Sequence, residues 1–328
     1  MKPTPILLDV DAGVDDTLAI IFALTSPLLD VRAITTVAGN VPVHVCTRNV
    51  LLTLQILSPI LSSFPIVAEG AVKPLKQKLF TAKEVHGNDG IGNASQFYGR
   101  PKMEAVRRSA VEVILETAGR EPNVTLVATG PLTNVALAIA KDRATMSHVR
   151  EIVVMGGAFK GMHNTGPVAE FNFYNDPDAA DEVMRSGLPI RLIPLNVTEK
   201  CILTPRDLDD LAYAPLRQYS QRITDFYFAF HKRTENFRGG YLHDPLAVAA
   251  VATPSLVHTE RGYVRVETTG KYSRGLSVFF PRLNIRREAE LPEWVKRALL
   301  GKSSVRLATS VDARSFKRKF LATIGSLH

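Results

Sequence analysis

The 328-residue sequence has only two cysteines and lacks any apolar run long enough to cross a bilayer. Cys46 and Cys201 are far apart and provide neither a disulfide framework nor a C-x-x-C metal motif. A membrane-spanning helix needs about 20 apolar residues. Acidic residues follow the short apolar run near the N-terminus, which is not typical of a signal peptide. We therefore expect a cytoplasmic protein without a membrane partner.

Positive and negative charges nearly balance in most of the chain, and the net positive charge is concentrated near its end. The formal net charge is +8, and residues 261–328 contain fifteen Lys/Arg and five Asp/Glu, so this region carries +10 and residues 1–260 carry −2. Such a region can contact nucleic acid or anionic lipid. However, its densest segment, RSFKRKF, is short and has no aromatic residues spaced for base stacking. We interpret the region as a solvated surface or a subunit contact and expect no nucleic-acid partner.

Short apolar runs rich in β-branched residues alternate with segments of helical periodicity. The expected strands are 6–10, 31–37, 65–69, 124–129, 151–155 and 190–195. The expected helices are 15–26, 42–57, 104–119, 131–141, 177–186 and a helical stretch at 217–252. This alternation predicts an α/β fold with an open, mostly parallel sheet and helices on both faces. Residues 262–280 instead predict a β-hairpin or edge addition, and without repeats or linkers we expect residues 1–328 to form a single domain.

Each predicted strand is followed by a corner of polar residues or glycines. Asp11, Asn40, the turn TGPLTN that begins at Thr129, the pair Gly156-Gly157 and Asn196 all occupy such positions. Ligands of open parallel sheets bind outside the carboxyl ends of the strands. We therefore expect these distant segments to form one site.

The stretch ILLDVDAGVDD at 6–16 places four aspartates within eight positions. Helix capping explains Asp15 or Asp16 alone, because acidic groups are favoured in the first helical turn. It does not explain why Asp11 converges on the same corner, and no Lys or Arg lies between residues 3 and 31. Several carboxylates within one turn need a compensating charge. Oxygen ligands without zinc-like Cys or His spacing favour a calcium or magnesium ion.

Further candidate residues lie in two later segments. In YLHDPLAVAA, Asp244 and Pro245 are typical of a helix start, but Asp244 could also be a ligand and His243 would titrate near neutral pH. In the loop 156–172, the amides and the acid could satisfy vicinal hydroxyls of a sugar, although surface solvation explains each of them singly. These residues are Asn164, Glu170 and Asn172.

Taken in order, these motifs resemble those of the inosine-uridine-type nucleoside hydrolases, which cleave the N-glycosidic bond of ribonucleosides. The motifs are DVDAGVDD, VAGN, VHGNDGIG, ATGPLTN, VVMGG, PVAEFN and HDPLAVAA, and they extend from Asp9 to about Ala250. Each motif is modestly specific, whereas the ordered set is strongly so. The resemblance implies the nucleoside hydrolase fold, a calcium cofactor, a ribonucleoside substrate and a homo-oligomer, either a dimer or a tetramer.

The resemblance also implies roles for individual residues. Asp11 would be the general base on a calcium-bound water, and His243 would assist protonation of the leaving base. The calcium ligands would be Asp11, Asp16, the Thr129 carbonyl and Asp244. The substrate-binding residues would be Asp15, Asn40, Met155, Asn164, Glu170 and Asn172 at the ribose, and His86 near the base.

The sequence departs from the family pattern at three places. Val10-Asp11-Ala12-Gly13 replaces the common Thr-Asp-Pro-Gly, and we expect Gly13 to permit the bend. The loop before Asn164 is one residue longer than in some relatives. Asn196 stands where many relatives have Asp, which could alter hydrogen bonding behind the metal.

Two other functions remain open from the sequence. A strand that ends in Asp-x-Asp also begins metal-dependent phosphohydrolases, and a ribose- or nucleoside-binding module could retain the pocket without turnover. The sequence leaves open the choice between purine and pyrimidine. The resemblance implies that base contacts come from the segment 73–92, which we interpret as a mobile lid, and from the helix at 217–238, with Tyr227, Phe228, His231 and Arg233 as candidates.

Overall fold

The computed structural model describes residues 2–282, 293, 296 and 305–325. In this part of the chain, nine strands form one sheet in the order β10-β9-β11-β6-β5-β4-β1-β2-β3. Its strands are β1 (Thr4–Val10), β2 (Leu29–Thr36), β3 (Ile66–Glu69), β4 (Thr125–Ala128), β5 (Glu151–Met155), β6 (Ile190–Ile193), β9 (Val257–Val266), β10 (Ser277–Pro281) and β11 (Val305–Val311). The pairings among β1 to β6 and between β6 and β11 are parallel, whereas β9 pairs antiparallel with both β10 and β11. A small second sheet joins β7 (Ile202–Leu203) to β8 (Gly240–Tyr241).

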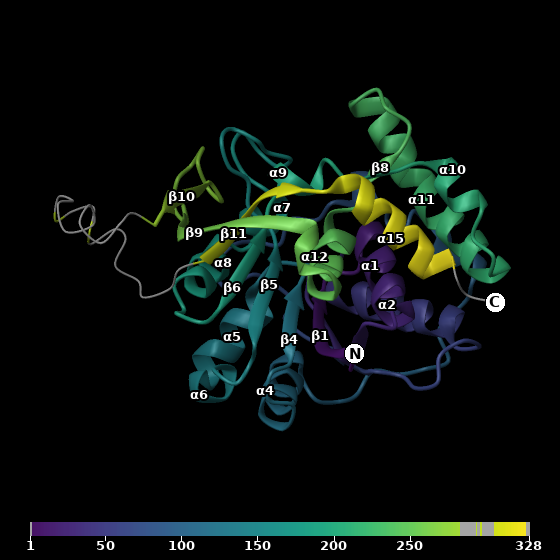
Figure 1. The fold of residues 1–328 in the computed structure, drawn as a ribbon, viewed down its shortest axis with the longest axis horizontal. Helices are drawn as coiled ribbons and strands as arrows, with labels where there is room; N and C mark the ends of the chain where they lie inside the picture. The colour runs from purple at the N-terminus through teal and green to yellow at the C-terminus, as the bar shows by residue number, and fades with distance from the viewer. Residues whose placement is uncertain (1, 283–292, 294–295, 297–304, 326–328) are drawn as a thin grey trace.

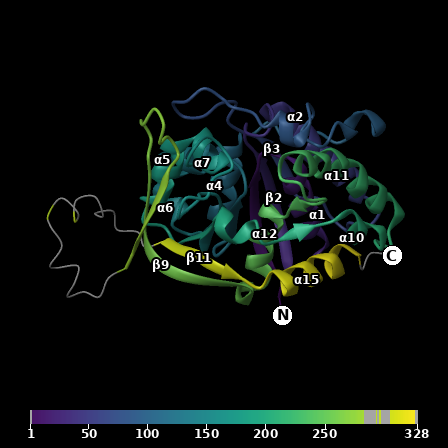
Figure 2. The same cartoon turned by 90° about the horizontal axis from the view of Figure 1, so that it is seen from above.

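Helices cover both faces of the large sheet, as the sequence predicts (Figures 1 and 2). One face packs against α1 (Val14–Thr25), α2 (Val43–Leu57), α11 (Ala214–Thr234), α12 (His243–Ala252) and α15 (Ala313–Gly325). The other face packs against α4 (Ala110–Arg120), α5 (Thr133–Lys141) and α8 (Pro177–Met184). The shorter helices are α3 (Lys83–His86), α6 (Arg143–Met146), α7 (Phe171–Asn175), α9 (Leu195–Thr198) and α10 (Pro205–Asp209), with 3₁₀ turns at Ala94–Phe97 and Pro254–Leu256.

Strand β1 lies inside the sheet and explains why an apolar run precedes the acidic corner. Its neighbours are β2 and β4. Side chains alternate between the two faces of a strand: Ile6 and Leu8 join the apolar core beneath α1, and Leu7 joins the core on the opposite face. Because both faces are buried, the strand holds Asp11 at a fixed place at the carboxyl edge.

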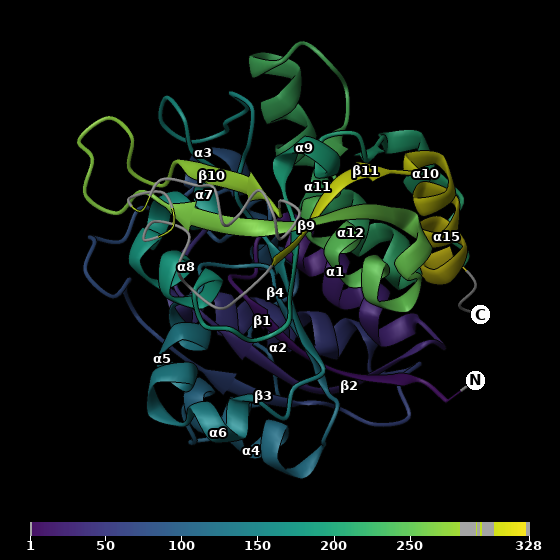
Figure 3. The same cartoon turned by 60° about the vertical axis from the view of Figure 1, so that its left-hand side comes forward.

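The predicted edge hairpin is present, and the predicted helical stretch at 217–252 is divided. Strands β9 and β10 pair antiparallel, and a bridge between Ala169 and Leu276 joins this hairpin to the loop before α7. Figure 3 shows β9 and β10 near α7. Helices α11 and α12 are separated by β8. A side chain at Gly240 would place its Cβ 2.3 Å from the Tyr227 ring, so glycine is needed where the chain passes α11. The periodicity on both sides conceals this break.

The basic region 261–328 contributes part of β9, all of β10 and β11, and the helix α15 to the fold. Strand β11 lies between β6 and β9, and α15 buries Phe316, Phe320 and Ile324. The Phe320 ring stacks on Phe22 of α1 with centroids 5.8 Å apart. The apolar face of α15 therefore belongs to the core. No helix within the described residues is both long enough and apolar enough to span a membrane.

Candidate active site

A cavity of about 680 Å³ lies at the carboxyl ends of the parallel strands. It is lined by nearly all the residues that the sequence singled out, although they come from distant segments. Those residues are Asp11, Asp15, Asn40, His86, Thr129, Met155, Asn164, Glu170, Asn172, His243 and Asp244. Asp16, which the resemblance gives as a metal ligand, does not line the cavity and is fully buried beside Asp15 and Asp244.

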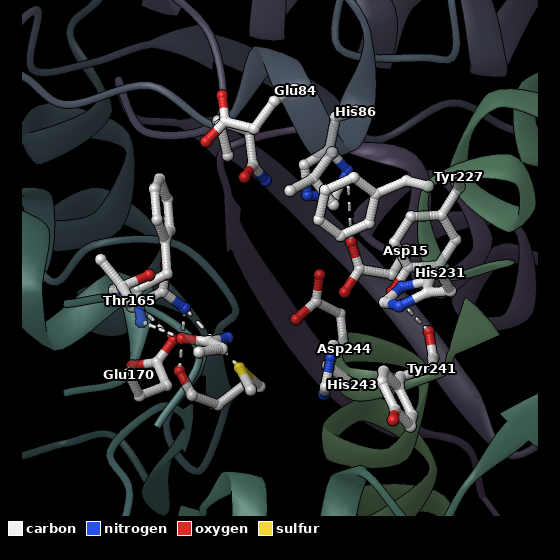
Figure 4. Close-up of a pocket in the computed structure, with 18 of the residues that line it drawn as sticks. Asp15, Glu84, His86, Thr165, Glu170, Tyr227, His231, Tyr241, His243 and Asp244 are labelled. Carbon is white, nitrogen blue, oxygen red and sulfur yellow. Dashed lines mark hydrogen bonds and ion pairs between the residues drawn. The ribbon is translucent and has the colours of Figure 1, made fainter. Parts of the chain in front are cut away.

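The acidic residues form a compact cluster that could hold a metal ion. One carboxylate oxygen from each of Asp15, Asp16 and Asp244 lies within 4.8 Å of the others. All three side chains are buried, and Figure 4 shows Asp15 and Asp244 facing each other across the floor of the pocket. Asp16 accepts hydrogen bonds from Gly13 N at 2.8 Å and from Thr129 Oγ1 at 2.7 Å, which fix its orientation.

Asp11 is held at one oxygen and free at the other. Its Oδ2 accepts a hydrogen bond from Asn40 N at 2.7 Å, whereas its buried Oδ1 has no hydrogen-bond partner within the described residues. Burial, and then the nearby Asp16 charge, raise the pKa of Asp11 well above its ordinary value. Such an orphaned buried oxygen is costly unless a ligand or proton satisfies it.

The ionised forms of the other carboxylates in the acidic cluster also require a compensating positive charge. Burial raises the pKa of Asp15 to about 7, and burial together with Asp15 and Asp16 raises the pKa of Asp244 well above its ordinary value. None of the described residues that line the cavity is Lys or Arg. The donor set is made of oxygen atoms, which suits a hard divalent cation. The residues therefore fit a metal ion, and the Thr129 carbonyl at the cavity wall can join them.

Gly13 serves the site in a different way from the one predicted. The left-handed conformation at the bend belongs to Ala12, with φ of 39°, whereas Gly13 has φ of −74°. A Cβ at Gly13 would lie 2.5 Å from Asn40 Nδ2 and 2.9 Å from His86 Nδ1. The prediction that Gly13 provides the bend is therefore wrong, because glycine is needed here for close packing of the site residues.

The acid-and-amide group of the loop 156–172 lies on the opposite side of the pocket from Tyr227 and His231, as Figure 4 shows for Glu170. Glu170 caps α7 and accepts hydrogen bonds from the backbone N–H of Asn172, Gly157 and Phe173. Burial nevertheless raises its pKa to about 7. Asn172 Nδ2 donates to the carbonyls of Thr129 and Met155, at 2.7 and 3.2 Å. These bonds connect the loop 156–172 to the ends of β4 and β5.

Of the two predicted histidines, His86 is buried and His243 is half-buried, and both are neutral at pH 7. Burial lowers the pKa of His86 and of His243 to about 3. His86 Nδ1 accepts a hydrogen bond from Val14 N at 3.1 Å, so its proton resides on Nε2. His243 Nδ1 lies 2.8 Å from Thr198 Oγ1. Thr198 therefore orients His243, a role that the sequence alone did not indicate.

The remaining wall of the pocket is aromatic and acidic, and the sequence analysis found only part of it. Tyr227 and His231, two of the candidate base contacts, line the pocket, whereas the other two, Phe228 and Arg233, do not. Lining residues missed by sequence reasoning include Glu199, Phe230, Glu235 and Tyr241. Their spacing carries no motif, and they meet only because the fold brings α11, β8 and the residues after α9 and α11 to one wall of the pocket.

Asn196 holds a loop and makes no hydrogen bond to the acidic cluster within the described residues. Its Oδ1 accepts from Phe159 N at 2.9 Å and its Nδ2 donates to Phe159 O at 2.8 Å. The expectation that this position affects hydrogen bonding behind the metal is therefore wrong. Both amide atoms are used to clamp the segment after β5.

Comparison with known proteins assigns this site to a family. Residues 6–318 match the sequence model described as inosine-uridine preferring nucleoside hydrolase. The chain is 40% identical over 313 residues to a probable uridine nucleosidase 2 of Arabidopsis thaliana, covering 94% of this chain and 93% of that protein. It is 41% identical over 278 residues to the pyrimidine-specific ribonucleoside hydrolase RihA of Salmonella arizonae, covering 84% and 88%.

Solved structures agree with the sequence relatives. The plant nucleoside hydrolase PpNRh1 aligns with a TM-score of 0.90 and 32% identity over 99% of both chains. A purine-preferring ribonucleoside hydrolase from Gardnerella vaginalis aligns with a TM-score of 0.86 and 30% identity over 98% of both chains. The similarity to these nucleoside hydrolases therefore covers nearly the whole chain, including the segments that form the pocket described above.

Proposed function

Because this chain belongs to the inosine-uridine preferring nucleoside hydrolase family and hydrolyses the N-glycosidic bond of ribonucleosides, we propose that Asp11 is its general base. The observation that carries this role is the unpartnered, buried Oδ1 of Asp11 at the floor of the cavity. This oxygen can take a proton from the attacking water, while Asn40 N holds the other oxygen in place. General base catalysis of this kind contributes about 10²–10⁴-fold to a rate.

Calcium is the proposed cofactor, and the proposed ligands are Asp11, Asp16, Asp244 and the Thr129 carbonyl. When bound, calcium would neutralise the carboxylates and orient the ribose hydroxyls and water, since it accepts many oxygen ligands in loose geometry. Asp16 suits this role because its hydrogen bonds to Gly13 and Thr129 fix the carboxylate before any ligand arrives.

The ribose is proposed to lie between the acidic cluster and the loop 156–172. Asp15 would accept a hydrogen bond from a ribose hydroxyl, and Asn40, Met155, Asn164, Glu170 and Asn172 would position the rest of the sugar. Asn172 supports this placement: its Nδ2 is used on two carbonyls, so Oδ1 is the atom left to accept from a hydroxyl. Developing positive charge on the sugar would be stabilised by the surrounding carboxylates.

His243 is proposed to assist the leaving base, and His86 is proposed to lie near that base. Because burial keeps His243 neutral, it would act by donating one N–H rather than as a standing imidazolium. A hydroxyl hydrogen donated by Thr198 to Nδ1 would place that N–H on Nε2. Charge that develops on the leaving nitrogen would then draw the proton across.

Pyrimidine ribonucleosides, and uridine first, are the proposed preferred substrates. Two relatives of about 40% identity are named for uridine or for pyrimidines, whereas a structural neighbour of 30% identity is named for purines. The test is to incubate the calcium-loaded protein with uridine, cytidine, inosine and adenosine and to measure free ribose. We expect the highest kcat/KM for uridine; a higher value for inosine or adenosine would contradict this preference.

The proposed setting is the cytoplasm, and the proposed assembly is a homodimer or homotetramer. The resemblance to the family supports the assembly, and the two buried, unpaired thiols are compatible with a reducing compartment. Light scattering coupled to gel filtration measures the assembly directly. A mass near 36 kDa, that of one chain, would contradict it.

A further inference from the structure

A second cavity, of about 330 Å³, lies at the amino ends of the parallel strands, on the edge of the sheet opposite the active site. Its charged lining residues are Arg150, Glu151, Arg191 and Arg306, and it is here called the arginine cavity. Glu151 is the first residue of β5, whereas Arg191 and Arg306 are the second residues of β6 and β11. The arginine cavity therefore shares no lining residue with the active site.

The register of the strands explains why two of these arginines meet. Strands β6 and β11 pair in parallel with Arg191 opposite Arg306, so both side chains lie on the same face of the sheet. Val153 of β5 is opposite Arg191 on the other side, and Glu151 shares the face of Val153 because it is two residues away. Like charges directly opposite each other destabilise a sheet, and Glu151 lies where it can offset one of the two.

The hydrogen bonds of the cavity occupy Arg191 fully but leave donors on the other two arginines. Arg191 Nε and Nη2 donate to the two carboxylate oxygens of Glu151, and Nη1 donates to the Ala250 carbonyl of α12 at 2.6 Å. Arg306 Nη2 also donates to Glu151, but its Nε and Nη1 have no partner within the described residues. The Arg150 side chain is exposed and has no hydrogen-bond or ion-pair partner in the same part of the chain.

The charges that line the cavity do not cancel. Three guanidinium groups and one carboxylate leave a net charge of +2. Arg191 and Glu151 are both 5% exposed and form a two-pronged ion pair, so one arginine already neutralises the buried glutamate. The surplus charge therefore belongs to Arg150 and Arg306, and it favours a ligand that carries two negative charges.

Phosphate is the ligand that matches this arrangement. Guanidinium groups bind phosphate oxygens in a planar geometry with two parallel hydrogen bonds. A phosphate dianion balances the net charge of +2, whereas a carboxylate balances only half of it. Pro254 and Val257 add an apolar wall and Thr259 adds a hydroxyl, which suit a small organic group attached to the phosphate.

We propose that the arginine cavity binds a phosphate group, either as inorganic phosphate or as the phosphate monoester of a small sugar. Arg150 and Arg306 contact the phosphate oxygens, and Glu151 holds Arg306 in place. This site uses neither the acidic cluster nor Asp11, so the inference goes beyond the proposed function and does not depend on it.

The test is isothermal titration calorimetry of the intact protein at neutral pH and low ionic strength. The titrants are inorganic phosphate, ribose 5-phosphate and, as a monocarboxylate control, acetate. We expect at least one of the two phosphates to bind saturably with a Kd of about 1 mM or lower, and acetate to bind about tenfold more weakly or worse. The Kd should increase as sodium chloride is added. Tighter binding of ribose 5-phosphate identifies a monoester as the ligand, and tighter binding of inorganic phosphate identifies the free ion.

Variants connect this binding to the arginine cavity. Arg150→Gln and Arg306→Gln each remove one surplus charge and should raise the Kd about three- to tenfold. Arg150→Lys keeps the charge but loses the two-pronged donor geometry, and should raise the Kd less than Arg150→Gln does. Arg100→Gln removes the same charge from an exposed position outside the cavity and should leave the Kd unchanged. Circular dichroism shows whether each variant is folded.

The outcomes separate this inference from the proposed function. Weaker binding of phosphate in Arg150→Gln and Arg306→Gln, with unchanged binding in Arg100→Gln, supports the inference. The inference is overturned if neither phosphate binds at concentrations up to about 10 mM, if acetate binds as tightly as phosphate, or if the two cavity variants bind phosphate like wild type. Failure of the proposed function has a different sign, the absence of ribose release from uridine.

Discussion

At the scale of single residues, the two carboxylate oxygens of Asp11 differ in their hydrogen-bond contacts. One is held by the backbone of Asn40, and the other is buried without a partner within the described residues. Cys46 Sγ also lies 3.0 Å from the Asp11 carbonyl, so the main chain at this residue is held as well. A side chain so constrained can act as a base without rearranging.

Replacing Asp11 by Asn tests this role with little change of shape. The amide can keep the contact with the Asn40 backbone only as an acceptor and cannot take a proton from water. We expect kcat for uridine to decrease by about 10²-fold or more. Steady-state kinetics measure the effect, and circular dichroism controls for folding; a variant with more than a tenth of wild-type kcat would contradict the assignment.

His243 is tested by the choice of leaving group. His243→Ala should lower kcat/KM for inosine far more than for 4-nitrophenyl riboside, because nitrophenolate departs without a proton. We expect a difference of about 10²-fold between the two losses. Equal losses on both substrates would show that His243 positions the sugar and does not assist the base.

Residue-scale prediction from sequence succeeded where the chemistry of the side chain was decisive. The acids and amides in the ordered motifs do converge on one cavity. It failed at Gly13, where the left-handed conformation belongs to Ala12, and at Asn196, whose amide clamps Phe159. The roles of Gly13 and Asn196 depend on backbone angles and local packing, and the spacing of motifs reveals neither.

At the scale of elements, alternation of strands and helices was readable because each has its own hydrophobic period. The apolar run at β1 and the capping box of Ser109 and Glu112 at α4 are visible in the sequence once the boundary is known. The break between α11 and α12 was not visible in the sequence, because helical periodicity continues on both sides of Gly239 and Gly240. For the same reason only Tyr227 and His231 of the aromatic and acidic pocket wall were predicted: its other members, Glu199, Phe230, Glu235 and Tyr241, come from α11, β8 and the residues that follow α9 and α11.

The clamp between Asn196 and the Phe159 backbone predicts a measurable effect on stability. Asn196→Asp can still accept from Phe159 N but cannot donate to Phe159 O when ionised, so one hydrogen bond is lost. We expect the free energy of unfolding to decrease by about 1 kcal/mol. Urea unfolding at pH 7 measures this; an unchanged or increased stability would show that the clamp is unimportant.

At the scale of the whole molecule, burial keeps the pocket histidines neutral and makes stability depend on pH. The folded-state pKa of His243 is about 3, below the ordinary value of 6.5. Between these values the unfolded chain binds a proton that the folded chain does not, so the free energy of unfolding decreases as pH falls. The contribution of His243 is lost from pH 6.5 downward.

Comparison of wild type with the variant His243→Asn separates the contribution of His243 to the pH dependence of stability from the opposite contribution of the buried carboxylates. His243→Asn has no group that titrates there, whereas the raised pKa of Glu170 is common to both proteins. The decrease in unfolding free energy from pH 7 to pH 5 should be about 2 kcal/mol smaller in His243→Asn than in wild type. Equal decreases in urea unfolding would indicate that His243 is protonated in the folded state.

The sheet brings the acids together, and their mutual repulsion supports the proposal that activity depends on a bound divalent cation. The most direct measurement is uridine hydrolysis by the intact protein before chelation, after removal of divalent ions, and after calcium is restored. We expect ribose release to cease on chelation and to return with calcium in wild type, and Asp244→Asn to need a much higher calcium concentration. Undiminished hydrolysis in the presence of excess chelator would contradict the account.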